Sequence, residues 1–134
     1  REKGYGILVF DAYRPWSISK ILWESASEAD RQNNFVANPR EGSKHNRGAA
    51  VDVSLFDLGT GAEVEMPSKF DEFSERAYPT YAGGSAESRR LRELLAQAMK
   101  AEGFELSNEE WWHFNYRNWR EYRLLNISFD ALAR

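Results

Sequence analysis

The chain has 134 residues, 42% of them apolar and 29% charged, with a net charge of −3 at pH 7. This composition is typical of a soluble globular protein, and the length suits one domain, residues 1–134, with a real core. The charge gives no electrostatic reason to expect nucleic acid or an anionic membrane as partner. The absence of cysteine excludes disulfides, thiolate metal sites and a cysteine nucleophile, but does not separate cytoplasm from periplasm. No apolar run approaches 18 residues, so no membrane span is predicted.

The chain opens with segments typical of a strand and a helix. Residues 1–4 lack Met and look like a helix end stopped at Gly4, so we expect a fragment or a processed chain. Residues 7–10 form a continuous apolar run, which predicts a strand buried on both faces. Pro15 suits a helix start, and a helix is predicted over residues 16–29. Its apolar stripe consists of Ile18, Ile21, Leu22 and Trp23.

The next part of the chain predicts a loop followed by a hairpin. Residues 31–42 are polar and contain proline and glycine, as expected of a loop. In residues 51–55 apolar side chains alternate with polar ones, which predicts a half-buried strand with Asp52 on its polar face. Residues 57–61 are typical of a hairpin turn, and they lead to a second predicted strand near residues 62–66.

The clearest helical pattern covers residues 86–102. Five apolar side chains form one stripe along it, Ser85 can cap its start, and Gly103 is a suitable stop. Before it, residues 68–71 resemble a capping box that would open a short helix. A loop is predicted for residues 77–85, which contain one proline and two glycines.

The end of the chain predicts two more strands and a tail. One strand starts at Phe104, a turn follows at residues 107–109, and residues 111–116 form a final aromatic strand. We expect the tail to Arg134 to pack over the sheet. Hairpin strands with separate helices favour an α+β fold, a central antiparallel sheet flanked by helices, over a doubly wound sheet.

The only two histidines lie in two stretches that also carry acids. His45, Asp52 and His113 make a plausible three-ligand set for one zinc ion, because catalytic zinc sites commonly use three His, Asp or Glu ligands and keep one position open. Such zinc lowers the pKa of bound water to about 7. Taken alone, His45 is more simply a surface loop residue and Asp52 a solvated strand acid. The joint pattern favours the metal.

Glu110 stands three residues before His113 and is a candidate general base. On a regular strand, positions i and i+3 point to opposite faces. Glu110 must therefore lie in the turn before the strand, or a bulge must intervene, for both side chains to face one metal ion. The spacing differs from the helical His-Glu-x-x-His arrangement of other zinc proteases, and Glu110 could equally be a plain turn acid beside Glu109.

Four further residues have a structural explanation from sequence alone. Arg14 follows the first strand, where it could stabilise an oxyanion, but an ion pair with Asp11 or Asp71 is the simpler interpretation. Asp71 is most simply the fourth residue of the capping box. Trp111 and Trp112 are more often core or pocket wall than catalytic.

Four segments resemble the D-alanyl-D-alanine dipeptidases, the zinc dipeptidases of vancomycin-resistance clusters and their chromosomal relatives. The resemblance runs from about Gly4 to Phe129 in the same order. It is carried by Asp-Ala-Tyr-Arg-Pro at 11–15, Ser-Lys-His-Asn-Arg-Gly-Ala-Ala-Val-Asp at 43–52, Phe-Asp-Glu-Phe at 70–73 and Glu-Trp-Trp-His at 110–113. The Ser-x-His-(six residues)-Asp and Glu-x-x-His signatures are shared with a wider superfamily of D,D-carboxypeptidases, L-alanyl-D-glutamate endopeptidases and the hedgehog signalling domain. The resemblance thus implies a hedgehog/D,D-peptidase-like fold.

The resemblance also implies a role for each site residue. His45, Asp52 and His113 would bind zinc, Glu110 would act as general base and acid, and Arg14 would polarise the scissile carbonyl. Ser43 and Asp71 would belong to the substrate pocket, with Asp71 near the free amino group of the substrate. Family members carry a further N-terminal region, including a tyrosine that contacts the substrate, and this chain lacks it.

These residues lead us to expect zinc-dependent hydrolysis of the dipeptide D-alanyl-D-alanine to two D-alanines. One alternative is a D,D-carboxypeptidase or another cell-wall peptide hydrolase of the same superfamily. The other is a non-catalytic zinc-binding module, against which the presence of both Glu110 and Arg14 argues, because a purely structural site needs neither.

Overall fold

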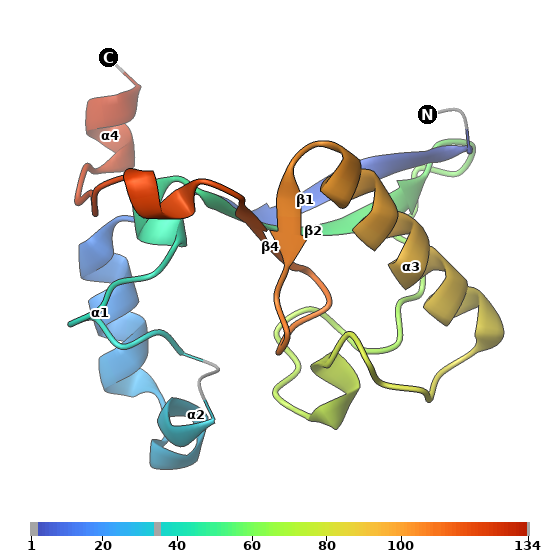
Figure 1. Cartoon of the computed structure of the whole chain (residues 1–134), viewed down its shortest axis with the longest axis horizontal. Helices are drawn as coiled ribbons and strands as arrows, with labels where there is room; N and C mark the ends of the chain where they lie inside the picture. Colours follow the sequence, from blue (N-terminus) through green and yellow to red (C-terminus); the bar gives the residue numbers. More distant parts are fainter. Residues whose placement is uncertain (1–2, 34–35, 134) are drawn as a thin grey trace. The chain divides into compact units, whose positions relative to one another are not determined.

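The structure, a computed structural model, describes residues 3–33 and 36–133 (Figure 1). Its internal contacts divide the chain into two compact units. The first unit comprises residues 1–11 and 51–117, and the second comprises residues 12–50 and 118–134. Lys3 and Gly4 form a turn, and Gly4 has a φ of 81°, as a helix-ending glycine would. The rest of the predicted helix end lies outside the described residues.

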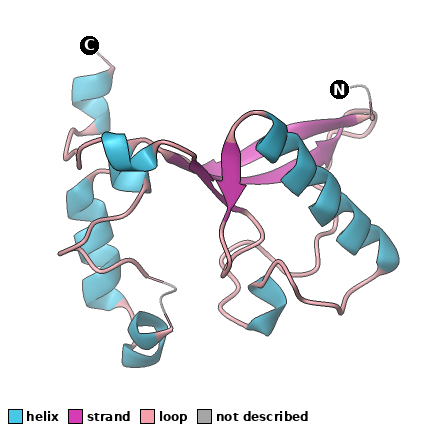
Figure 2. Cartoon of the chain, in the orientation of Figure 1, coloured by secondary structure: helices cyan, strands magenta, loops and turns pink. Residues whose placement is uncertain are grey.

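A four-stranded antiparallel sheet forms the centre of the first unit (Figure 2). Its strands are β1 (Tyr5–Asp11), β2 (Ala50–Asp57), β3 (Phe104–Leu106) and β4 (His113–Tyr116), in the spatial order β1-β2-β4-β3. β1 and β2 pair from Tyr5 opposite Asp57 up to a bulge between Val9 and Asp11, after which Asp11 lies opposite Asp52. The predicted α+β class with an antiparallel sheet is confirmed. β4 begins two residues later than expected.

Helix α3 (Ala86–Ala101) packs its apolar stripe into the core of the first unit. The Ser85 side chain accepts a hydrogen bond from the Ser88 backbone N–H, and Gly103 follows with a φ of 85°. This confirms the predicted Ser85 cap and Gly103 stop, because serine caps free N–H groups and glycine adopts the left-handed conformation at little cost. The helix itself ends at Ala101, one residue before the predicted end. The core side chains around the helix are Val53, Leu55, Leu91, Leu95, Met99, Trp111, Trp112 and Phe114.

Two burial predictions for the sheet were wrong. β1 is not buried on both faces, since Ile7 and Val9 are 41% and 58% exposed. It is an edge strand, and these alternate side chains face away from the core. β2 is more than half-buried, because it lies between β1 and β4. Asp52 and Ser54, expected on a polar outer face, are only 4% and 0% exposed.

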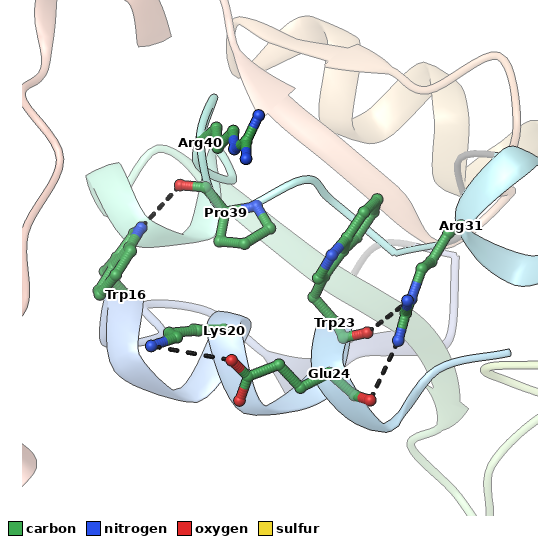
Figure 3. Close-up of a pocket in the computed structure, with 7 residues that line it drawn as sticks. All are labelled: Trp16, Lys20, Trp23, Glu24, Arg31, Pro39 and Arg40. Atoms are coloured by element: carbon green, nitrogen blue, oxygen red, sulfur yellow. Dashed lines mark hydrogen bonds and ion pairs between the residues drawn. The ribbon is translucent and has the colours of Figure 1, made fainter. Parts of the chain in front are cut away.

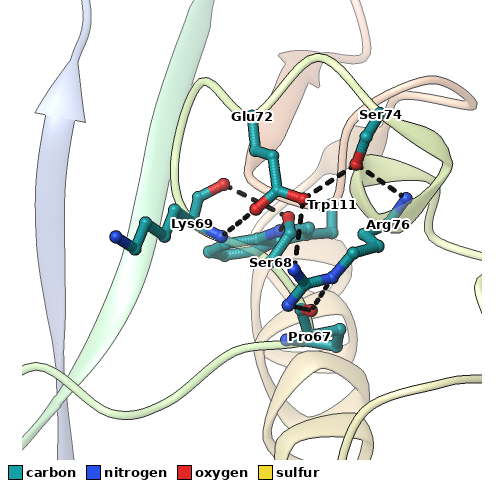
Figure 4. Close-up of polar contacts among 7 residues, drawn as sticks. All are labelled: Pro67, Ser68, Lys69, Glu72, Ser74, Arg76 and Trp111. Carbon is teal, nitrogen blue, oxygen red and sulfur yellow. Dashed lines mark hydrogen bonds and ion pairs between the residues drawn. The ribbon is translucent and has the colours of Figure 1, made fainter.

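The segment after the hairpin turn also differs from the prediction. The turn at Asp57 is present, but residues 62–66 contribute only an isolated bridge between Phe56 and Glu63 instead of a strand. No helix begins at residues 68–71. The segment is held by side-chain hydrogen bonds instead: Glu72 accepts from the Lys69 backbone, and Arg76 donates to the Pro67 carbonyl (Figure 4).

The second unit contains short helices. They are α1 (Trp16–Ser25), α2 (Glu28–Gln32), α4 (Phe129–Leu132) and the 3₁₀ turns η1 (His45–Arg47) and η3 (Trp119–Glu121). The helix predicted over residues 16–29 stops at Ser25, because Ala26 is extended and the Ser27 side chain caps a new helix. Arg31 and Gln32, predicted as loop, therefore belong to α2. The expected stripe is not core: Ile18, Ile21 and Leu22 are 40–58% exposed.

A shallow groove of about 420 Å³ lies along α1, lined by two indole rings and several charged side chains (Figure 3). Arg31 donates from its guanidinium to the carbonyls of Trp23 and Glu24. It therefore satisfies free carbonyls at the C-terminal end of α1. The Trp16 indole donates to the Pro39 carbonyl, which ties the loop that follows α2 back to α1. These contacts explain the groove as part of the packing of this unit.

The tail was predicted to pack over the sheet, and its described hydrogen bonds instead go to residues of the second unit. Leu125 donates to the Asn46 carbonyl and accepts from the Trp16 backbone. The Tyr13 hydroxyl donates to the Ile127 carbonyl. Among the described residues, no helix is both long and apolar enough to cross a membrane.

Leu95 is fully buried in the core, which predicts a large loss of stability on truncation. We expect Leu95→Ala to lower the free energy of unfolding by about 2 to 5 kcal/mol through lost burial and the cavity left behind. Denaturant unfolding measures this loss. Leu58→Ala in the same unit is the matched control, because Leu58 is 45% exposed and its truncation should cost no more than about 0.5 kcal/mol. Equal losses for the two variants would contradict this assignment of the core.

Candidate functional site

The first unit brings Asp52 and His113 together on neighbouring strands. The Val53 backbone N–H of β2 donates to the Trp112 carbonyl just before β4. The His113 Nδ1 atom then lies 3.0 Å from Asp52 Oδ1, and both side chains are largely buried. This separation suits two ligands that each lie about 2 Å from one ion.

The other nitrogen of the His113 ring has its own partner, Asn115. Its amide oxygen lies 2.9 Å from Nε2. A carbonyl-type oxygen only accepts hydrogen bonds, so Nε2 carries a hydrogen and Nδ1 is the ring atom left for a proton or a metal ion. The donor set and the tautomer of His113 therefore fit zinc.

Glu110 lies beside this pair, outside β4. Its Oε2 atom is 3.7 Å from His113 Nδ1, and its side chain is 17% exposed. The sequence allowed Glu110 to lie either in the turn before the strand or next to a bulge, and in the structure Glu110 precedes β4. Burial raises the pKa of Glu110 to about 7, an effect that His113 opposes and the charges of Asp52 and Asp71 reinforce. This carboxyl group can therefore exchange a proton near neutral pH.

Trp111 and Trp112 hold the backbone next to Glu110. The Trp111 indole donates to the Ser68 hydroxyl at 2.8 Å, and its backbone N–H donates to the Ala77 carbonyl at 2.9 Å (Figure 4). The two indoles pack edge to face with centroids 5.3 Å apart, and each is only 1% exposed. Both belong to the core, one of the two roles expected for them.

Asp71 is not the helical residue that the capping-box interpretation assigned. Its φ of 58° is left-handed, a rare conformation for a residue other than glycine. Phe70 before it stacks on Phe10 at 4.3 Å and meets Trp112 edge to face at 5.6 Å. This packing fixes the turn, and the charge of Asp71 acts on the buried Glu110.

The second unit holds His45 by its own hydrogen bonds. His45 is 3% exposed, and its Nδ1 lies 2.6 Å from the Ala12 carbonyl, which accepts only. Nδ1 therefore carries the hydrogen, and Nε2 is the ring nitrogen that would ligate a metal ion. The His45 carbonyl accepts from the Arg14 backbone, and the Ser43 hydroxyl accepts from the His45 backbone N–H. Arg14 and Ser43 are thus neighbours of His45 in the fold.

Two asparagines, Asn46 and Asn115, were assigned no role from the sequence. Asn46 is fully buried, accepts from the Ser43 backbone N–H, and donates to the Arg14 carbonyl. Asn115 is the partner of His113. The sequence could have predicted that Asn115 lies beside His113, since residues two apart on a strand face the same side. It could not have predicted the contacts of Asn46, because a short turn has no side-chain periodicity.

The three predicted zinc ligands are two histidines and an aspartate, residue types that could hold a metal ion. Asp52 and His113 lie together in the first unit, and His45 lies in the second. Histidine nitrogens and a carboxylate oxygen are ligand types of metal sites with nitrogen and oxygen coordination, so the class of protein is an α+β protein with a candidate metal centre.

Comparison with known proteins gives the family. A family model described as D-ala-D-ala dipeptidase, peptidase M15, matches residues 1–124, and the chain belongs to this family. The chain is 32% identical to D-alanyl-D-alanine dipeptidase of Escherichia coli K12 over 96% of its length and 64% of that protein. It is 31% identical to the D-alanyl-D-alanine dipeptidase of Enterococcus faecium, over 87% of this chain and 64% of the relative. The resemblance found in the sequence is confirmed. The chain spans a little under two thirds of the length of these relatives.

The hydrogen bond between Trp111 and Ser68 predicts a measurable coupling. Ser68→Ala leaves the buried indole N–H without its acceptor, which should lower the free energy of unfolding by about 1 to 3 kcal/mol. Adding Trp111→Phe should then cost less than it does in the wild-type chain, because the donor is removed as well. Chemical denaturation of both single variants and the double variant gives the coupling. Strictly additive losses would contradict the hydrogen bond's contribution.

Proposed function

We propose that this chain is the catalytic zinc domain of a peptidase that hydrolyses D-alanyl-D-alanine to two D-alanines. One observation carries the proposal: the Asp52–His113 pair has the buried carboxyl group of Glu110 beside it, 3.7 Å from the ring. A structural metal site is closed by protein ligands and does not need a second acid beside the one that ligates the metal. The names of the relatives in Escherichia coli and Enterococcus faecium support the dipeptide as the substrate.

In this proposal one zinc ion is bound by Nε2 of His45, a carboxylate oxygen of Asp52 and Nδ1 of His113. The hydrogen bonds to Ala12 and Asn115 support this choice of nitrogens, because each occupies the other nitrogen of its ring. When bound, zinc supplies Lewis acidity, which lowers the pKa of water and polarises a peptide carbonyl.

Glu110 is the proposed general base and then the general acid. It accepts a proton from the attacking water as the oxygen bonds to the carbonyl carbon, and it donates that proton to the leaving amine as the C–N bond breaks. Its burial keeps bulk water away, and its pKa of about 7 suits a group that must both accept and release a proton.

Arg14, Asp71 and Ser43 complete the proposal on the substrate side. The Arg14 guanidinium stabilises the negative charge that develops on the carbonyl oxygen. The Asp71 carboxylate pairs with the free ammonium group of the dipeptide, so the substrate should need an unblocked N-terminus. Ser43 contributes to the pocket through the loop, since its hydroxyl holds the backbone of His45.

The substrate class can be tested directly. The zinc-loaded chain should release D-alanine from D-Ala-D-Ala, and should leave N-acetyl-D-Ala-D-Ala intact because an acetylated amine cannot pair with a carboxylate. A chelator should abolish release, and added zinc should restore it. Coupled detection of free D-alanine is the assay, with L-Ala-L-Ala as a stereochemical control. Cleavage of the acetylated substrate would favour a carboxypeptidase, and no release from a zinc-loaded chain would contradict catalysis by this domain.

The role of Glu110 predicts a separation of catalysis from metal binding. Glu110→Gln keeps the shape of the side chain but cannot take the proton, so we expect kcat to fall by about 10²- to 10⁴-fold. Zinc affinity should change little, because Glu110 is not one of the proposed ligands. Glu109→Gln is the matched control, since this neighbouring acid is exposed and should keep full activity. Unchanged turnover in the Glu110 variant, with zinc bound, would exclude it as the base.

A further inference from the structure

We propose that Asn115 is a positioning residue for the metal centre, which holds the His113 ring in the tautomer that presents Nδ1 to zinc. The inference rests on the proposed zinc site and adds a residue that determines how tightly the site binds its metal. No motif of the sequence analysis included Asn115.

The strand places Asn115 where it can act on the ring. His113 and Asn115 are two residues apart on β4, so their side chains leave the same face of the sheet. Asn115 lies opposite Glu105 of β3, and this pairing holds its backbone in register. Its Oδ1 atom is 2.9 Å from His113 Nε2, and both side chains are half-buried.

Both atoms that face the imidazole nitrogens are oxygens. Asp52 Oδ1 lies 3.0 Å from Nδ1, and Asn115 Oδ1 lies 2.9 Å from Nε2. The Asn115 amide oxygen can only accept a hydrogen bond, so Nε2 of His113 carries the hydrogen and donates it to Asn115. Nδ1 is then the ring nitrogen that would ligate a metal ion.

Losing this acceptor has two physical consequences. The neutral ring becomes free to keep its hydrogen on Nδ1, where it donates to Asp52 and blocks the metal ligand atom. The ring also loses the bond that fixes its orientation. Outer partners of ligating histidines typically change metal affinity by about 10- to 100-fold.

The test compares zinc affinity among variants of one position. In Asn115→Leu the side chain keeps a similar size but has no acceptor, and zinc affinity should fall by about 10- to 100-fold. Asn115→Asp keeps an oxygen that accepts from Nε2 and should bind zinc about as tightly as the wild-type chain. Glu105→Gln, directly across the sheet, is the matched control and should leave affinity unchanged. Competition with a chromophoric chelator gives the dissociation constants, and denaturant unfolding of the metal-free variants shows that each is folded. Asn115→Ala replaces the leucine variant if the latter is unfolded.

A second readout follows the ring itself, because the chain has only two histidines. In ¹⁵N-histidine spectra of the zinc-loaded wild-type chain, one ring should have metal on Nδ1 and a hydrogen on Nε2. This signature should weaken in the leucine variant and persist in the aspartate variant. Wild-type affinity in Asn115→Leu, or equal losses in the leucine and aspartate variants, would overturn the role of Asn115 while leaving the zinc site intact. A wild-type chain that binds no zinc would overturn the proposed site itself.

Discussion

The pairing of β2 with β4 is the constraint on which the first unit depends. The hydrogen bond from the Val53 backbone N–H to the Trp112 carbonyl sets the register of two strands that are about 60 residues apart in sequence. If β2 slipped by one residue relative to β4, the Asp52 side chain would move to the other face of the sheet and would no longer lie beside His113. The register is secured by the core, since Val53 and Trp112 are both almost fully buried. The packing of the core and the placement of Asp52 beside His113 thus have the same structural origin.

Sequence patterns predicted the fold well where one periodicity dominated. The stripe of α3, with Ser85 and Gly103 at its ends, was sufficient because local propensity and core packing agree there. The patterns failed where a tertiary or a competing local interaction decided the outcome. The capping-box residue Ser68 is the partner of the Trp111 indole, 43 residues away, and no helix begins there. Ser27 caps α2, so the helix predicted over residues 16–29 is broken in two. Position in the sheet, which the sequence does not state, decided the exposure of Val9 and the burial of Ser54.

The candidate site shows the same division. The two histidines could be selected from sequence because the chain has no others, and Glu110 because it stands close to His113 in the chain, although its i, i+3 spacing left its orientation open. Ser43 and the pocket role of Asp71 came only from the family resemblance, since a serine in a loop and an acid beside an aromatic residue have no periodic signature. The structure places Asp71 in a left-handed turn, where its charge raises the pKa of Glu110, and its role in a substrate pocket stays a prediction. Asn115 could have been found from strand alternation, had His113 been taken as the reference point.

The buried acids of the first unit, Asp52 and Glu110, favour the binding of a cation beside them. Asp52 is almost fully buried, Glu110 is largely buried, and the charges of Asp52 and Asp71 both disfavour ionisation of Glu110. A chain selected for stability alone would replace such acids, because each buried charge needs a partner to offset its lost hydration. His113 is one partner of Asp52, at 3.0 Å. A divalent ion on Asp52 and His113 would add positive charge beside Glu110 and would favour the ionised form of its carboxyl group. The burial of these acids is therefore consistent with the proposed metal site, because binding of a cation would offset their lost hydration.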